Sequence, residues 1–141
     1  MTNRGLDSER FEAISRELLQ NGMGVRFEAR GASMSPAIRD GEIVYVTPVI
    51  VSKLRKDDIV LSKGHSGFRV HRLVVADQDK NLFITRGDCG EQDDPPLRSE
   101  QILGVAIAKE VRIGNKLMRA RFNSVGGRAL RCGYPTRTRE T

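Results

Sequence analysis

The sequence predicts a mainly β protein, in which a curled and mostly antiparallel β domain follows one N-terminal helix. Two observations support this fold class. Apolar residues recur with a helical period in residues 7–21, whereas from residue 25 onward the chain consists of short β-like segments separated by turn residues. No helical pattern lies between these segments, which argues against a parallel sheet with crossover helices.

Residues 7–21 are predicted to form the helix and to dock on the β domain. Asp7 or Ser8 is the expected N-cap, and Asn21-Gly22 is the expected end. The docking face is predicted from residues spaced three or four apart, namely Phe11, Ile14, Leu18 and Leu19.

Six segments are predicted as strands. They cover residues 25–30, 42–47, 57–62, 67–76, 81–86 and 101–112. Turn signals such as Asp40-Gly41 and Asp94-Pro95-Pro96 separate them. Residues 115–122 are predicted as a last strand or a short helix.

The 141 residues are enough for one domain with a core of its own. We expect an N-terminal helix in residues 1–24, a β domain in residues 25–112 and a basic C-terminal tail in residues 113–141. Residues 111–141 contain eight Lys or Arg and one acidic residue, Glu140, so the net charge of +6 is concentrated there. Three interpretations of the tail stay open: a solvated segment, peripheral contact with an anionic membrane, and nucleic-acid contact, which is disfavoured because only Phe122 and Tyr134 are available for stacking.

The sequence also predicts where the chain resides. Its longest apolar runs, such as residues 43–46 and 49–51, are too short to cross a bilayer, and residues 1–20 lack the apolar core of a signal peptide. We therefore expect a cytoplasmic protein, with attachment to the periphery of a membrane as the alternative. Cys89 and Cys132 have no metal-ligand spacing, and in a reducing compartment we expect both to be free thiols.

One serine and one histidine are candidates for nucleophilic chemistry. Ser33 lies in the Gly-Ala-Ser-Met-Ser-Pro segment of residues 31–36, and His71 lies in a Val-His-Arg segment further along the chain. A serine hydroxyl becomes nucleophilic when a base within hydrogen-bond reach takes its proton. The chain has two histidines, and His65 is expected in solvent at a hairpin tip, so His71 is the candidate base.

These segments belong to a longer ordered set of blocks. In chain order the blocks are residues 33–36, 40–46, 56–61, 69–74, 85–88 with 93–94, and 102–105. Over residues 29–108 this set resembles the type I signal peptidase family, which shares its catalytic core with LexA-like self-cleaving domains. Val70-His71-Arg72 resembles the histidine type of that family rather than the lysine type.

The resemblance implies that residues 25–112 form the catalytic domain of a serine endopeptidase that needs no cofactor or metal. Ser33 would attack the scissile carbonyl, and His71 would take its proton and return it to the leaving amine. Asp94 is the first choice to orient the imidazole, with Asp88 and Asp93 as supporting candidates.

The resemblance also implies how a substrate would bind. A peptide, protein or leader segment would lie as an added strand beside the Ser33 loop, in contact with Gly31 and Met34, with a small residue such as alanine next to the cut. The backbone N–H of Ser33 would form part of the oxyanion hole. Gly31 stands where some bacterial members carry a hydroxyl residue as a second donor, so that second donor is not identified.

Two other functions are compatible with the same residues. A LexA-like regulator would cleave itself, but only about 30 residues precede Ser33, and they contain neither an Ala-Gly nor a Cys-Gly pair. A catalytically inactive peptide-binding module would keep the fold without turnover, and the presence of both Ser33 and His71 argues against it.

Overall fold

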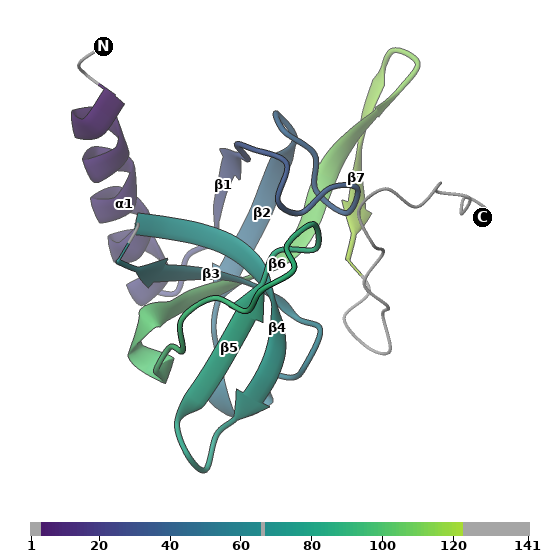
Figure 1. Ribbon diagram of the computed structural model, residues 1–141. Coiled ribbons are helices and arrows are strands. Elements are labelled where there is room, and N and C mark those ends of the chain that lie inside the picture. Colours follow the sequence, from purple (N-terminus) through teal and green to yellow (C-terminus); the bar gives the residue numbers. More distant parts are fainter. Residues whose placement is uncertain (1–3, 66, 123–141) are drawn as a thin grey trace.

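The computed structural model describes residues 4–65 and 67–122 of the chain. In this part, seven antiparallel strands form one curled sheet with a single α-helix beside it (Figure 1), which confirms the predicted fold class. The elements in chain order are α1 (Arg4–Gln20), β1 (Val25–Glu28), β2 (Ile43–Pro48), the 3₁₀ turn η1 (Val51–Lys53), β3 (Ile59–Gly64), β4 (Gly67–Asp77), β5 (Leu82–Arg86), the 3₁₀ turn η2 (Ser99–Gln101), β6 (Ile102–Ile113) and β7 (Lys116–Arg121).

Helix α1 ends where the sequence predicts but begins earlier. It starts at Arg4, so the predicted cap at Asp7 or Ser8 is wrong. At its end, Gly22 adopts a φ of +82° and donates its N–H to the carbonyl of Leu19 at 3.1 Å, as a C-terminal glycine cap requires. Ile14 is 58% exposed although it was predicted to face the domain. Among the described side chains of α1, the buried ones are Ser15 and Leu19, which lie four residues apart on one face, and Ile14 lies off that face.

The strands pair in the order β1-β2-β6-β3-β4-β5, and β7 pairs with β6 outside this path. Strand β6 therefore joins β2 to β3, although both precede it in the chain. The sequence predicts a strand or a short helix in residues 115–122, and the structure shows the strand β7 there. The remainder of the predicted tail, residues 123–141, lies outside the described residues.

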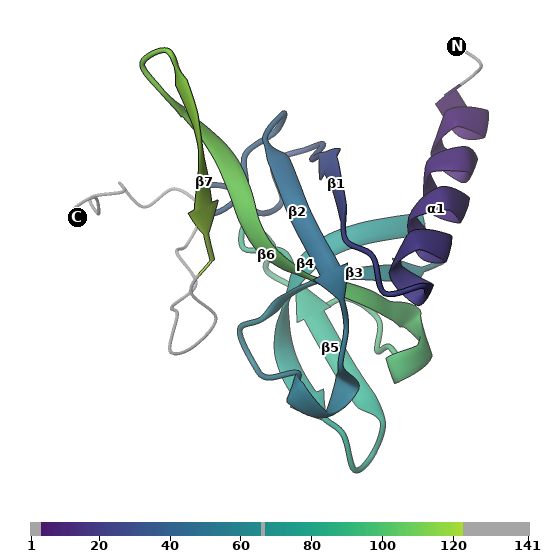
Figure 2. The same ribbon diagram turned by 180° about the vertical axis from the view of Figure 1, so that it is seen from behind.

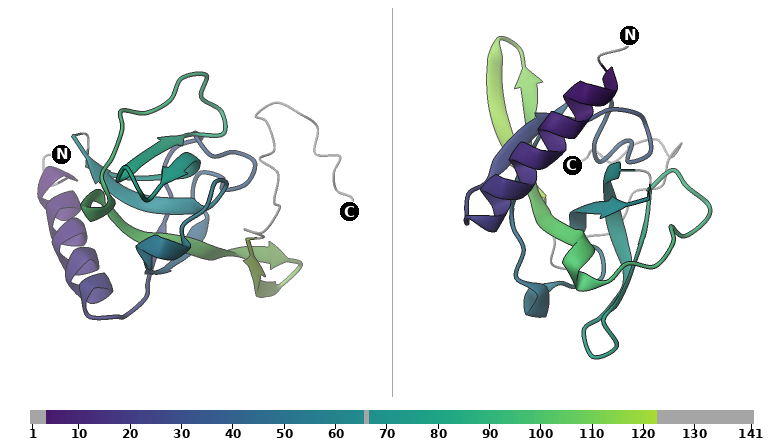
Figure 3. Two further views of the ribbon diagram at one scale, coloured as in Figure 1. Left: turned by 90° about the horizontal axis from the view of Figure 1, so that it is seen from below. Right: turned by 90° about the vertical axis from the view of Figure 1, so that its left-hand side faces the viewer.

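The sheet buries apolar side chains on both faces. On β3, Ile59 and Leu61 belong to one core cluster and Val60 to the other, as the two-residue alternation of a strand dictates. Leu19 of α1 joins the first cluster. Two views show α1 beside β1, crossing one side of the sheet, while the hairpin of β6 and β7 projects from the opposite side (Figures 2 and 3). Within residues 4–65 and 67–122, no helix has both the length and the apolar character needed to span a bilayer.

Candidate active site

The loop between β1 and β2 holds Ser33 at the surface. Its base is closed by two backbone hydrogen bonds, from the Ala29 N–H to the Glu42 carbonyl and from the Gly41 N–H to the Ala29 carbonyl, both 2.8 Å. Met34, which the resemblance assigns to substrate contact, is 3% exposed and anchors the loop in the core, whereas Ser33 beside it is exposed. The buried Met34 thus fixes the loop while the neighbouring Ser33 stays at the surface.

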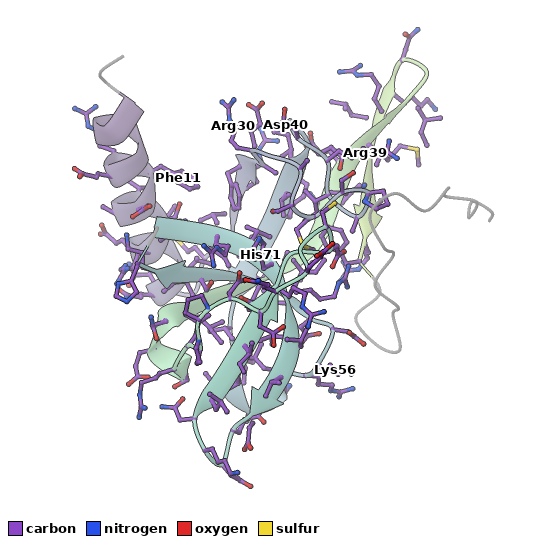
Figure 4. All side chains as sticks on the ribbon, in the orientation of Figure 1. Phe11, Arg30, Arg39, Asp40, Lys56 and His71 are labelled. Carbon is purple, nitrogen blue, oxygen red and sulfur yellow. The ribbon has the colours of Figure 1, made fainter. Side chains whose placement is uncertain are left out.

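The loop turns at Gly31. Gly31 adopts a φ of +88°, a conformation that favours glycine, and its N–H donates to Asp40 Oδ1 at 2.7 Å. Arg30 and Asp40 accordingly lie at the same end of the strand pair (Figure 4). Gly31 therefore serves the turn that leads into Ser33, and it also lines the adjoining groove.

Strand β4 brings His71 to this loop. His71 Nε2 lies 3.1 Å from Ser33 Oγ, although 38 residues separate the two in sequence. His71 Nδ1 lies 2.6 Å from Asp94 Oδ2. Because an ionised carboxylate only accepts hydrogen bonds, Nδ1 carries the proton, and Nε2 of the neutral ring is left to accept the proton of the serine hydroxyl. The histidine side chain is 12% exposed, so the ring is held by its surroundings.

Asp94 is fixed by two further side chains that the sequence did not single out. Thr85 Oγ1, fully buried on β5, donates to Asp94 Oδ2 at 2.7 Å. Arg69 Nη1 lies 3.1 Å from Asp94 Oδ1. Arg69 precedes His71 by two positions on β4 and therefore points to the same face of the strand. The two-residue spacing could have indicated that Arg69 lies on the same face as His71, but it does not show that both contact Asp94.

The other two predicted aspartates have different partners. Asp88 makes a two-pronged ion pair with Arg72, with both N–O distances 2.9 Å, and both side chains are nearly buried. Asp93 pairs with Arg86 near the surface, at 2.6 and 2.8 Å. Asp88 thus holds the loop after β5 against the strand that carries His71, and the carboxylate placed on the imidazole is that of Asp94.

The loop after β5 approaches Ser33 very closely. A Cβ atom on Gly87 would lie 2.9 Å from the Ser33 carbonyl oxygen and 3.0 Å from His71 Nε2. The next turn adds a backbone hydrogen bond of 2.9 Å from the Cys89 N–H to the Ser33 carbonyl. Cys89 is disulfide-bonded, so the expectation of a free thiol is wrong for this residue. Cys132 lies outside the described residues.

A groove of about 960 Å³ begins at this site. One side is formed by β1 and the Ser33 loop, the other by β3 and β4, and α1 contributes at its wall. Gly31, Ser33, Met34 and His71 all line it, so the structure brings the predicted substrate-binding residues and the Ser–His pair to one cavity.

Fold and site together define a class of protein. A serine, a histidine and an aspartate linked in this order by hydrogen bonds are the arrangement of serine hydrolases, which recurs on unrelated folds. The chain is similar to the signal peptidase complex catalytic subunit SEC11 of the yeast Ogataea parapolymorpha. The two are 34% identical over 80 residues, which cover 46% of this chain and 44% of the relative.

The similarity to SEC11 confirms the predicted resemblance to signal peptidases, at a distant level, and supports membership of a serine-peptidase family. No family model matches the chain. Because the match spans less than half of the relative's length, the relative's activity is carried to this chain as a proposal.

Proposed function

We propose that this chain is a serine endopeptidase of signal-peptidase type that works through Ser33, His71 and Asp94. The observation that carries the proposal is the pair of contacts at His71, 3.1 Å to Ser33 Oγ and 2.6 Å to Asp94 Oδ2. Proton transfer to a general base requires a separation of about 2.6–3.2 Å.

The proposed mechanism follows from these positions. Ser33 Oγ attacks the scissile carbonyl while its proton passes to His71 Nε2, and Asp94 stabilises the imidazolium that forms. The imidazolium then gives the proton to the leaving amine, and the C–N bond breaks to leave an acyl-serine. Water, deprotonated by the same imidazole, hydrolyses this ester and restores the hydroxyl. The Ser33 N–H is the proposed oxyanion donor.

Strand register supports binding of the substrate as an added strand. Leu73 donates to Asp58 on the β3 side, so alternate residues Phe68 and Val70 turn their backbone groups away from β3. Strand β5 covers only the second half of β4, from Arg72 onward. Across the groove, β1 pairs with β2 alone, and its Glu28 has backbone groups facing away from β2. An extended peptide between these two edges would find hydrogen-bonding groups on both sides.

The test is cleavage of a peptide library with small residues at varied positions, analysed by mass spectrometry. The full chain should cut a subset of the peptides, and Ser33→Ala should lower the rate by about 10⁴-fold or more with an unchanged circular dichroism spectrum. Ser52→Ala, in the exposed turn η1, is the matched control and should cleave normally. Full activity of Ser33→Ala would overturn the proposal. Loss of the intact chain's mass during the incubation, with the appearance of its fragments, would favour the self-cleaving alternative.

We further propose that the protein acts at the periphery of an anionic membrane. The β6–β7 hairpin supports this, because Ile113, Leu117 and Met118 are 61%, 58% and 49% exposed, next to the exposed basic residues Arg112 and Lys116. Apolar side chains can enter the interface while each nearby cation adds about 1 kcal/mol. Sedimentation with vesicles containing phosphatidylserine, but not with phosphatidylcholine vesicles, is expected. Equal recovery with both would contradict the proposal.

A further inference from the structure

Phe11 of α1 connects the two sides of the groove. Its ring packs edge-on against Phe27 of β1, with centroids 5.3 Å apart and an interplanar angle of 68°. The same ring packs against Phe68 of β4 at 5.9 Å and 74°. Phe11 projects from α1 toward the strands (Figure 4), and all three rings line the groove. One aromatic side chain thus reaches both edges between which a substrate strand would lie.

Glu12, the next residue of α1, accepts a hydrogen bond from the backbone at the edge of β4. Its Oε2 accepts the N–H of Phe68 at 3.2 Å, and its Oε1 receives Lys63 Nζ at 2.5 Å. Phe68 is one of the residues whose backbone faces the groove, so this N–H is not available to an added strand. At the other end of the edge, Arg72 pairs with β5. Val70 is therefore the residue of β4 whose backbone stays available for pairing in the groove.

We propose that α1 is the end wall of the substrate groove, and that Phe11 and Glu12 limit how many substrate residues can bind on one side of the cut bond. This inference rests on the proposed function. The cut bond lies at Ser33 and His71, and the wall meets β4 at Phe68, three positions before His71. At about 3.3 Å per residue of extended chain, the groove accommodates about three substrate residues between the cut and the wall.

The limit follows from both chemistry and shape. A longer peptide would have to displace the Phe11 ring from two aromatic partners, or leave the groove before reaching it. It would also gain no hydrogen bond from Phe68, whose N–H already has a charged acceptor. Additional residues on this side should therefore add nothing to kcat/KM.

The experiment uses a peptide that the full chain cleaves and two series derived from it, one lengthened at its N-terminal end and one at its C-terminal end. In the series whose added residues extend toward α1, kcat/KM should stop rising at about three residues from the cut. In Glu12→Ala the rise should continue for one or two more residues, by about twofold to tenfold for the recovered hydrogen bond of the Phe68 N–H. In Phe11→Ala the rise should also continue, because the ring no longer blocks the groove. Glu12→Ala serves as the second variant in case Phe11→Ala fails to fold.

Ile14→Ala is the matched control, because Ile14 lies on the same helix and is 58% exposed. It should keep the wild-type length profile. The inference is overturned if both wild-type series keep rising beyond three residues, or if both groove variants keep the wild-type profile. Absence of any Ser33-dependent cleavage would instead overturn the proposed function, and the inference with it.

Discussion

Replacing Gly87 with alanine would test directly whether the contact between Ser33 and His71 is needed for activity. The added Cβ would lie 2.9 Å from the Ser33 carbonyl oxygen, 3.0 Å from His71 Nε2 and 3.1 Å from Ser33 Cβ. Ordinary contacts of this kind begin at 3.4 Å. The methyl group must therefore push the serine backbone and the imidazole away by about 0.5 Å, the gap between 2.9 and 3.4 Å.

This displacement can be converted into a rate. If it adds to the present 3.1 Å between Ser33 Oγ and His71 Nε2, the separation becomes about 3.6 Å, which is beyond hydrogen-bond reach. A misplacement of about 1 Å can cost about 100-fold in rate, so kcat/KM of Gly87→Ala should fall about tenfold to 100-fold. Overpacking should also lower the free energy of unfolding by about 1–3 kcal/mol.

The assay is peptide cleavage by the folded variant, with urea unfolding measured in parallel. Gly64→Ala is the matched control, because a Cβ at Gly64 meets no atom within 4 Å and its φ is not positive. It should retain wild-type kcat/KM. A folded Gly87→Ala with wild-type kcat/KM would refute the reasoning, since the two groups would then not need the separation that the structure gives them.

Three further predictions concern the groups around the site. Asp94→Asn should lower kcat by on the order of 10⁴-fold with little change in KM, because the amide no longer holds the required tautomer of His71; a single-turnover rate equal to wild type would contradict this. Arg72→Met leaves Asp88 buried without its cation and should lower the free energy of unfolding by about 3–5 kcal/mol, measured by urea titration. An unchanged urea midpoint of unfolding would show that the ion pair contributes nothing to stability. Burial raises the pKa of Glu12, but hydrogen bonds from a lysine and a backbone N–H, with the lysine charge, outweigh it and lower the pKa overall. The ionised Glu12 therefore stabilises the folded protein above the ordinary glutamate pKa of about 4.3, and this contribution is lost as the pH falls through the lowered pKa. The melting temperatures of wild type and Glu12→Gln should accordingly converge in acid. A constant difference between them from about pH 7 to about pH 3 would refute this.

The strands were predictable because their signals are local. Each of the six predicted segments overlaps an observed strand, since two-residue alternation and turn residues are properties of neighbouring positions. The error at Ile14 has the opposite origin. Its spacing fits a helix face, but the tertiary packing of α1 decides which edge of that face is buried.

The sequence by itself determined the β character of the chain and the order of its motif blocks, and through them the choice of Ser33, His71 and Asp94. Only the tertiary structure decided what surrounds them. The contact of Asp94 with Arg69 and Thr85 requires β4 and β5 to pair in one register. The pairing of Asp88 with Arg72, and the placement of α1 across the groove, likewise join residues that are distant in the chain. Such contacts depend on which strands become neighbours, and local periodicity carries no information about that choice.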